Sequence, residues 1–253
     1  MPSTCPNCGE PTTQKYCQAC GQQSHPPRIT MRQVFRDIGN FLFNVDSPFW
    51  VTLRLAYTNP GKLSRSFIDG QRRTYFHPIR FFIVATAFYY LFVWIFDFNP
   101  VKFSYQSMGQ GELYDEHGQD ITIRMSDIIR KNINILMFIW VFVASGLDRL
   151  FYRKTPYNIA ERSVLYFYTI GAYIIAYSPF IALSAANISP DIVRASLVIF
   201  FFPYAVMSFH RKKGFLKALA ALGHVILTFT LYVLIISIII LAVLYAMEYN
   251  TPH

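Results

Sequence analysis

The chain has 253 residues, of which 53% are hydrophobic, 17% aromatic and only 15% charged. Many apolar residues are gathered in runs of about 18–25, the length that spans a bilayer, which excludes a soluble globular protein. The net charge of +9 does not indicate nucleic-acid binding, because the basic residues flank the apolar runs, where they set membrane topology.

Two CxxCG motifs stand near the N-terminus, with cysteines at Cys5, Cys8, Cys17 and Cys20. Each CxxC turn supplies two thiolates, so the two pairs predict one tetrahedral zinc site. The glycine after each pair permits the left-handed conformation at which such a turn closes. The N-terminus has no secretory apolar core, so we expect it in the reducing cytosol, which disfavours two disulfides. Four thiolates leave no open coordination position, so a structural zinc ribbon is expected, one that can bind a cytosolic protein partner.

Residues 28–78, after the ribbon and linker of residues 1–27, are predicted to form amphipathic, interfacial helices. From Thr30, apolar residues recur at three- and four-residue spacing opposite a basic face. Such a helix lies in the membrane interface or packs on its own protein. A second short helix should start at Pro48 and end at Asn59-Pro60-Gly61, and Asp69-Gly70 marks a further turn.

A basic and aromatic stretch, residues 59–80, precedes the first apolar run. Basic residues mixed with aromatic ones suit the cytoplasmic headgroup layer. One interpretation is an anion or lipid-headgroup site, because arginine can bind phosphate through two parallel hydrogen bonds. Its candidate residues are Arg72, Arg73, Tyr75, His77 and Arg80. The alternative is that these arginines act only as charges that contact lipid phosphates and fix topology.

The fold class expected for residues 79–253 is an all-α polytopic bundle of five transmembrane helices. The predicted spans are residues 79–96, 133–151, 163–184, 192–209 and 219–247. Pro179 and Pro203 should kink the third and fourth spans. In the outer loop, residues 97–132, the alternation in residues 101–105 and 121–125 predicts a small β-hairpin.

The positions of Lys and Arg predict the orientation in the membrane. With the N-terminus and the loops 148–162 and 210–217 inside, these segments hold most of the 23 Lys and Arg residues. The N-terminus is therefore expected in the cytosol and the C-terminus on the extracytoplasmic side. The membrane expected is the bacterial cytoplasmic, or inner, membrane.

The paired CxxCG motifs and the stretch Gly70-Gln71-Arg72-Arg73-x-Tyr75-x-x-Pro78 resemble a bacterial family of uncharacterised membrane proteins. The motif of that family reads G-[KQ]-R-x-x-Y-x-x-P, with Lys common where this chain has Gln71. The resemblance extends from Cys5 to about Phe96 and implies an architecture without an assigned activity. The five-helix layout is also similar, in topology alone, to the Yip family of membrane-trafficking proteins.

These features favour a non-enzymatic integral membrane protein, either a zinc-ribbon adaptor or a lipid-interacting scaffold, with membrane lipids as partners. The alternative is a small transporter or channel, although no inverted repeat is visible in the sequence. An intramembrane enzyme is less favoured, because GxSxG, HExxH and Walker motifs are missing from the sequence. His224 in the last span is either a buried, satisfied histidine or part of a proton relay.

Overall fold

The computed structural model describes residues 3–4, 9–19, 21, 48–72, 74–98, 116–186 and 188–249. Residues 3, 116–131, 133–134 and 244–249 are described by their backbone alone. The chain divides into two compact units, Met1–Ser47 and Pro48–His253.

The first unit contains a short antiparallel pair of strands, β1 (Ser3–Thr4) and β2 (Pro11–Thr12). Gly9 and Gly21 have φ angles of 74° and 75°, which confirms the left-handed conformation predicted for the glycine after each cysteine pair. Cys17 is buried, and its carbonyl accepts a hydrogen bond from the Gly21 amide at 2.8 Å. The other three predicted zinc ligands, Cys5, Cys8 and Cys20, lie outside the described residues, as does the helix predicted from Thr30.

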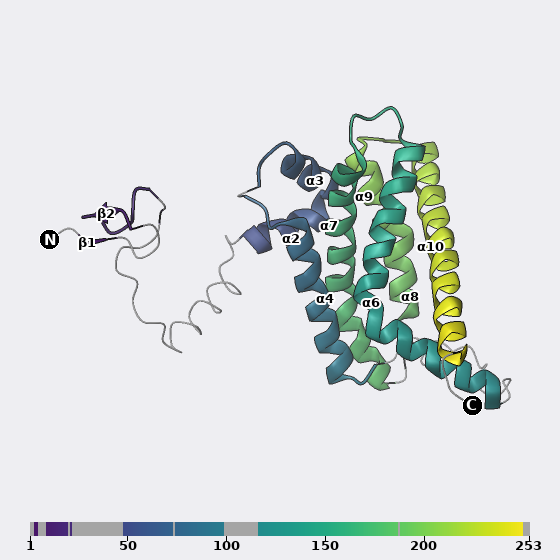
Figure 1. The fold of residues 1–253 in the computed structure, drawn as a ribbon. Coiled ribbons are helices and arrows are strands. Elements are labelled where there is room, and N and C mark those ends of the chain that lie inside the picture. The colour runs from purple at the N-terminus through teal and green to yellow at the C-terminus, as the bar shows by residue number, and fades with distance from the viewer. Residues whose placement is uncertain are drawn as a thin grey trace. The chain divides into compact units, whose positions relative to one another are not determined.

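The second unit begins with two short helices, α2 (Pro48–Thr58) and α3 (Pro60–Ile68) (Figure 1). Asn59 separates them with a non-helical backbone, and its side-chain oxygen accepts the Lys62 amide hydrogen. Proline suits the first turn of each helix, because the N–H that it lacks would have no helical partner there. The helix start at Pro48 and the break at Asn59 were therefore predicted correctly.

Four helical segments are long and apolar enough to cross a membrane, and each overlaps a predicted span. They lie within α4 (Pro78–Ile95), α7 with the 3₁₀-helix η2 (Ile159–Tyr177 and Ser178–Ala186), the run α8–η3–α9, and α10 (Phe215–Tyr249). The run consists of α8 (Asp191–Ser196), the π-helix η3 (Leu197–Phe201) and α9 (Phe202–Phe209). The second unit is therefore a helical protein of membrane type.

Helix α6 (Glu116–Phe151) contains the remaining predicted span, residues 133–151. Asn132 has a non-helical backbone, so the helix breaks one residue before that span. The span is not one of the four segments above, and five crossings stay a prediction. The predicted hairpin is wrong, because residues 121–125 are helical. Their alternation covers only five residues, whereas Ile121, Met125 and Ile128 recur at helical spacing.

The backbone departs from regular α-helix geometry at both predicted prolines. Helix α7 gives way to the 3₁₀-helix η2 at Ser178, directly before Pro179. The π-helix η3 precedes Pro203, whose missing N–H cannot bond to the carbonyl of Ile199. A π-helical turn is a usual response to such an interrupted ladder.

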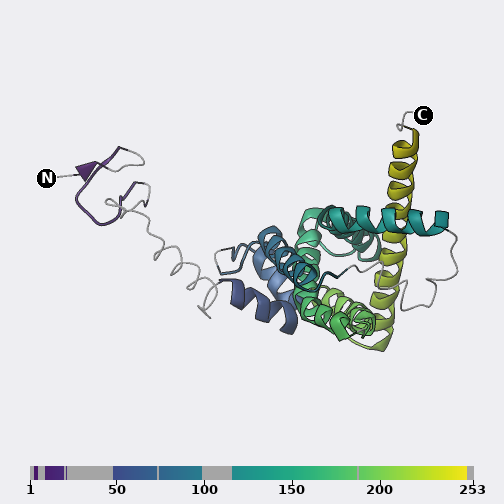
Figure 2. The ribbon, with the colours of Figure 1, turned by 90° about the horizontal axis from the view of Figure 1, so that it is seen from below.

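Helix α7 is the most enclosed element of the second unit. It packs against α4, α6 and α9, and α2 and α3 also contact it. A Cβ placed on Gly171 would lie 2.7 Å from the Phe81 ring, so this glycine permits the close approach of α4. Helix α10 packs on α6 and α9 and stands at the edge of the bundle (Figures 1 and 2).

Candidate functional site

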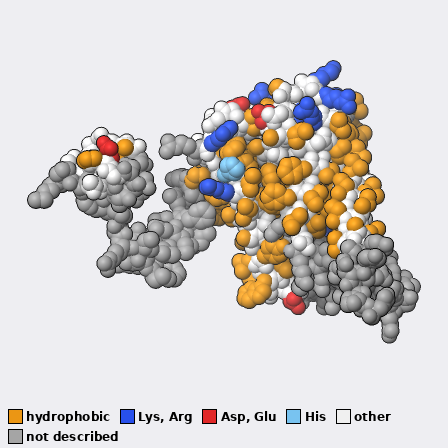
Figure 3. Space-filling model, viewed as in Figure 1, with side chains coloured by type: hydrophobic (Ala, Val, Ile, Leu, Met, Phe, Trp, Pro, Cys, Tyr) orange, Lys and Arg blue, Asp and Glu red, His pale blue; other side chains and the backbone are white. Residues whose placement is uncertain are grey.

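Lys and Arg side chains gather at one end of the helices, where α2, α3 and the start of α4 lie (Figures 1 and 3). We call this the basic end. The turns after α6 and α9 belong to it, as do the first turns of α7 and α10. Its described basic residues are Arg54, Lys62, Arg65, Arg72, Arg80, Arg149, Arg153, Lys154, Arg162, Arg211, Lys212, Lys213 and Lys217. Among the Lys and Arg side chains that the structure describes in the second unit, Arg194 alone lies at the opposite end.

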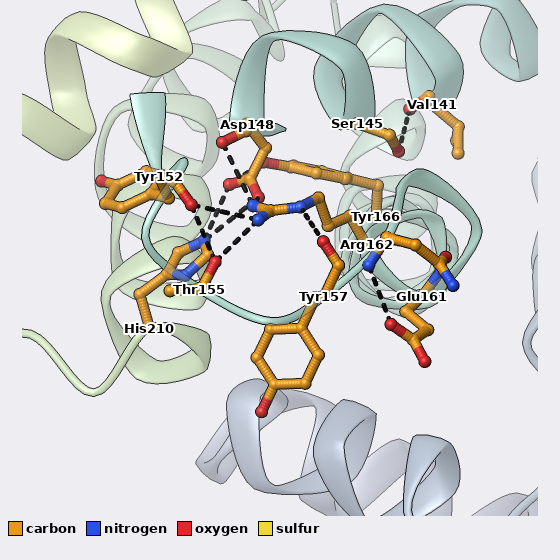
Figure 4. Close-up of polar contacts among 11 residues, drawn as sticks. Val141, Ser145, Asp148, Tyr152, Thr155, Tyr157, Glu161, Arg162, Tyr166 and His210 are labelled. Atoms are coloured by element: carbon orange, nitrogen blue, oxygen red, sulfur yellow. Dashed lines mark hydrogen bonds and ion pairs between the residues drawn. The ribbon is translucent and has the colours of Figure 1, made fainter. Parts of the chain in front are cut away.

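A buried cluster of polar side chains lies inside the basic end (Figure 4). At its centre is Asp148, in the last turn of α6, which is completely buried. Arg162, in the first turn of α7, forms an ion pair with the Asp148 carboxylate and is itself only 1% exposed. Buried charges of this kind persist only where both partners are paired and hydrogen-bonded.

The Arg162 guanidinium uses all its N–H groups on the turn between α6 and α7 (Figure 4). Nε donates to the Tyr157 carbonyl at 2.9 Å. Nη2 donates to the Tyr152 carbonyl at 3.1 Å and to Thr155 Oγ1 at 2.6 Å. Nη1 donates to both the carboxylate and, at 3.1 Å, the carbonyl of Asp148. A single side chain therefore fixes the conformation of the whole turn.

Two further side chains, one from α7 and one that directly follows α9, hydrogen-bond to the Asp148 carboxylate. The Tyr166 hydroxyl donates to Asp148 Oδ1 at 3.0 Å. His210 follows α9, and its Nε2 lies 2.9 Å and 3.1 Å from the two Asp148 oxygens. An ionised carboxylate only accepts, so His210 Nε2 carries the hydrogen. The His210 ring also stacks on Tyr152 at 3.9 Å between centroids. Burial and the Asp148 charge raise the pKa of Tyr152.

Local sequence explains why Arg162 faces α6. Asn158 caps α7: its side chain accepts the Glu161 amide hydrogen at 2.9 Å, and the Glu161 carboxylate accepts the Asn158 amide hydrogen at 2.8 Å. This reciprocal capping box sets the first residue of the helix. Residue 162 then lies at the end of the first turn, beside the last turn of α6.

His224, predicted as either a satisfied histidine or a relay member, lies beside the cluster. It is 1% exposed and its ring centroid is 6.2 Å from that of Tyr152 and 6.4 Å from that of Tyr166. Neither of its ring nitrogens hydrogen-bonds to Asp148, Arg162, Tyr166 or His210. Thr228, one turn further along α10, donates to the His224 carbonyl rather than to its ring. His224 therefore packs against the cluster without a hydrogen bond to it there.

A pocket of about 520 Å³ opens outside the turn that Arg162 holds. Its walls include Arg149, Leu150, Arg153, Tyr157, Asn158 and Arg162. Arg149 and Leu150 come from the end of α6, and Asn158 and Arg162 from the start of α7. Thr155 and Arg162 thus belong both to the pocket wall and to the hydrogen bonds of the buried cluster.

The predicted anion site at the start of α4 is spread over an exposed surface. Arg72, His77 and Arg80 are exposed, and Tyr75 is half-buried. Arg72 lies over the Phe67 ring at 5.9 Å, and the His77 ring packs edge-on against the same ring at 5.6 Å. The fifth candidate, Arg73, lies outside the described residues.

Asn59-Pro60-Gly61, predicted only as a helix break, also attaches α3 to α9. A Cβ on Gly61 would lie 2.2 Å from the Ser208 carbonyl carbon, so only glycine fits. The Ser208 hydroxyl lies 2.9 Å from Asn59 Oδ1 and accepts the Gly61 amide hydrogen at 3.1 Å.

Arg65 strengthens the same attachment, because its Nη1 donates to the carbonyls of Ser208 and Phe209, at 2.6 and 2.7 Å. A cation at the last carbonyls of a helix favours the helix dipole. Burial and the nearby charge of Arg211 lower the pKa of Arg65.

Sequence reasoning missed the cluster of Asp148, Arg162 and His210. Asp148 carried a usable signal, because an ionisable residue inside a predicted span is a default functional candidate. Arg162 and His210 each lie one residue outside a predicted span and read as ordinary loop charges. His210 is 62 residues from Asp148 along the chain, so spacing could not show that they meet.

Comparisons with known proteins identify one family and no characterised relative. Residues 46–90 match the model of a family described as a protein of unknown function, DUF3667. No curated protein matches the chain. No solved structure matches it either. The matched residues run from just before α2 into α4 and include the motif from Gly70 to Pro78, so this segment is similar to a family whose function is undefined.

Proposed function

We propose that this protein is a non-enzymatic integral membrane scaffold whose basic end binds anionic lipids at the cytosolic face of the bacterial inner membrane. In this proposal the N-terminal zinc ribbon binds a cytosolic protein partner, and the helices hold it at the membrane. The N-terminus lies in the cytosol and the C-terminus outside. Five helices cross the bilayer, with residues 133–151 of α6 as the fifth crossing.

The observation that carries the proposal is the separation of charge along the bundle axis. Side chains of the basic end surround the termini of α4, α6, α7, α9 and α10, whereas large apolar side chains cover the outer faces of the helices (Figure 3). Basic residues favour the cytosolic side of a membrane. The anionic lipids of that leaflet attract each nearby Lys or Arg by about 1 kcal/mol. A basic end of this size supports lipid binding as well as orientation.

The state of the buried charges supports a non-enzymatic role. The Asp148 carboxylate is engaged by Arg162, Tyr166 and His210. Every N–H of the Arg162 guanidinium donates a hydrogen bond to a protein acceptor. A catalytic acid or base needs a free position within reach of a substrate. These two charged groups are instead arranged to connect helices.

The zinc proposal is supported by the residues described in the first unit. Gly9 and Gly21 adopt the left-handed backbone that two CxxCG turns require. Cys17 is 3% exposed, as expected of a ligand enclosed by its own loop. Four cysteine thiolates suit tetrahedral zinc and would supply the folding free energy of a segment too short for a hydrophobic core.

The lipid-binding proposal is tested at Arg72, Arg73 and Arg80. The full-length protein is placed in nanodiscs of phosphatidylcholine with phosphatidylglycerol, and retained lipids are counted by native mass spectrometry. Changing all three arginines to Gln should weaken phosphatidylglycerol retention by up to about 150-fold, because each loses roughly 1 kcal/mol. The proposal fails if the triple Gln variant inserts normally and retains the lipid like the wild-type protein.

Two further variants are compared with the triple Gln variant, one as a control and one to show how the arginines act. Arg194→Gln removes a charge at the opposite end, where Arg194 pairs with Asp191 at 2.7 Å, and should leave retention unchanged. The triple Lys variant separates the two interpretations of the arginines. Lys should suffice if they act as charges, and should fail if the planar guanidinium is needed to bind phosphate.

A further inference from the structure

The pocket between the ends of α6 and α7 has the composition of an anion site. Arg149 lies in the last turn of α6 and Arg153 follows two residues after that helix ends, and both line the pocket. Both are exposed. Within the described residues, neither guanidinium takes part in an ion pair or a hydrogen bond. We propose that this pocket binds the phosphate group of a membrane lipid headgroup, held between Arg149 and Arg153.

The rigidity of the pocket wall supports a built site. The turn of residues 152–158 is fixed from inside by Arg162, through the carbonyls of Tyr152 and Tyr157 and the hydroxyl of Thr155. The other side of the turn is fixed by the capping box of Asn158. A binding wall that is ordered before the ligand arrives avoids the entropy cost of ordering it on binding.

The pocket has a net positive charge that favours binding of an anion. Arg162 contributes little net field, because Asp148 neutralises it at close range. Arg149 and Arg153 keep their charge available to a ligand. Each guanidinium can present two parallel N–H groups to phosphate oxygens. The side-chain amide of Asn158 lines the same pocket and adds a neutral donor.

The position of the pocket favours a lipid over a free phosphate compound. Leu150 lines it and is 55% exposed, and Ile159 at the start of α7 is 43% exposed. Exposed apolar side chains beside exposed arginines mark the level where the acyl region meets the headgroups. The volume of about 520 Å³ lies within the range of small-ligand pockets.

This inference deepens the proposed function, because it assigns one specific headgroup site within the basic end. Its residues are separate from the surface at the start of α4. The two ideas therefore fail independently: the triple Gln variant of Arg72, Arg73 and Arg80 tests the surface, and a pair of variants at Arg149 and Arg153 tests the pocket.

The test uses the full-length protein in phosphatidylcholine nanodiscs that contain either phosphatidic acid or phosphatidylglycerol, with retained lipid counted by native mass spectrometry. The wild-type protein should keep one phosphatidic acid per chain after neighbouring lipids have been stripped. The double change Arg149→Gln and Arg153→Gln should lower the apparent affinity at least about 150-fold, because each guanidinium loses charge-assisted hydrogen bonds to the phosphate as well as its charge. Lys212→Gln with Lys213→Gln removes the same charge from the same end outside the pocket, and should lower the affinity by no more than about thirtyfold, the loss expected from two point charges at the membrane surface.

A third arm identifies the source of the phosphate. Glycerol 3-phosphate is added in excess to nanodiscs that hold phosphatidic acid. Retention of the lipid supports the headgroup assignment, whereas displacement keeps a phosphate site at Arg149 and Arg153 but overturns the lipid as its ligand. The site itself would be overturned if the double arginine variant and the double lysine variant lost the same affinity for phosphatidic acid while their thermal stability was unchanged.

Discussion

Replacing Arg162 with Met should destabilise the helical unit more than any surface charge change does. The variant keeps a long side chain but removes the five donated hydrogen bonds of the guanidinium. It also leaves Asp148, which is completely buried, without its cationic partner. Removing one member of a buried ion pair costs about 3–5 kcal/mol. For a unit of this size that corresponds to roughly 6–20 °C in the midpoint of thermal unfolding.

The assay is thermal unfolding in detergent, followed by tryptophan fluorescence. Trp140 reports on the core directly, because its ring lies 5.7 Å from that of Tyr166 and 5.0 Å from that of Phe202. A thiol-reactive dye would not report on these helices, since all four cysteines lie within the first 20 residues. Arg153→Met is the matched control: it removes the same charge from an exposed position nearby and should change stability by about 0.5 kcal/mol or less.

A double variant distinguishes the ion pair from the other bonds of Arg162. Asp148→Leu alone leaves Arg162 buried without its anion, and should also cost about 3–5 kcal/mol. Combining Asp148→Leu with Arg162→Met removes both charges, so the two losses should not add. The reasoning is refuted if Arg162→Met unfolds within a degree or two of Arg153→Met, or if the double variant loses the full sum.

Three other predictions concern separate parts of the chain. Gly61→Ala should lower the free energy of unfolding by about 1–3 kcal/mol, because its Cβ would meet the backbone of α9. Gly223→Ala, with nothing within 4 Å of the new carbon, should be neutral or stabilising in the same unfolding assay. Purified protein should contain one zinc per chain by elemental analysis, and Cys17→Ser should abolish it without affecting helix insertion; metal-free wild-type protein would contradict this. Single cysteines on a cysteine-free background should be labelled from outside at position 115 and from the cytosol at position 213, and the reverse pattern would overturn the proposed orientation.

Periodicity and apolar run length were sufficient to find most of the fold. A run of apolar residues must be helical in a membrane, because each backbone group needs an internal partner. The start at Pro48 and the break at Asn59 followed from proline chemistry, which acts locally. The failure was residues 121–125, where a short alternation was given more weight than the helical spacing around it.

The buried cluster could not be predicted in the same way. Its formation depends on three helix ends reaching one point, and local sequence rules do not specify how helix ends are placed in space. The tyrosines of α7 show the same limit. A tyrosine in an apolar span usually indicates an interface anchor or a packing residue. The hydroxyl of Tyr166 instead donates to Asp148 Oδ1 at 3.0 Å, and that of Tyr168 to the Phe76 carbonyl at 2.6 Å.

The π-helix η3 has a consequence for how related chains can vary in length. A π-helical turn is equivalent to one extra residue inside an α-helix. The wider turn absorbs most of the roughly 100° of rotation that one extra residue adds to an α-helix. Deleting one residue from Leu197–Phe201 would therefore leave the parts on either side facing nearly the same way. Because α9 is also attached through Ser208 and His210, a homologue that is one residue shorter here should present the same face of α8 and keep its buried cluster intact.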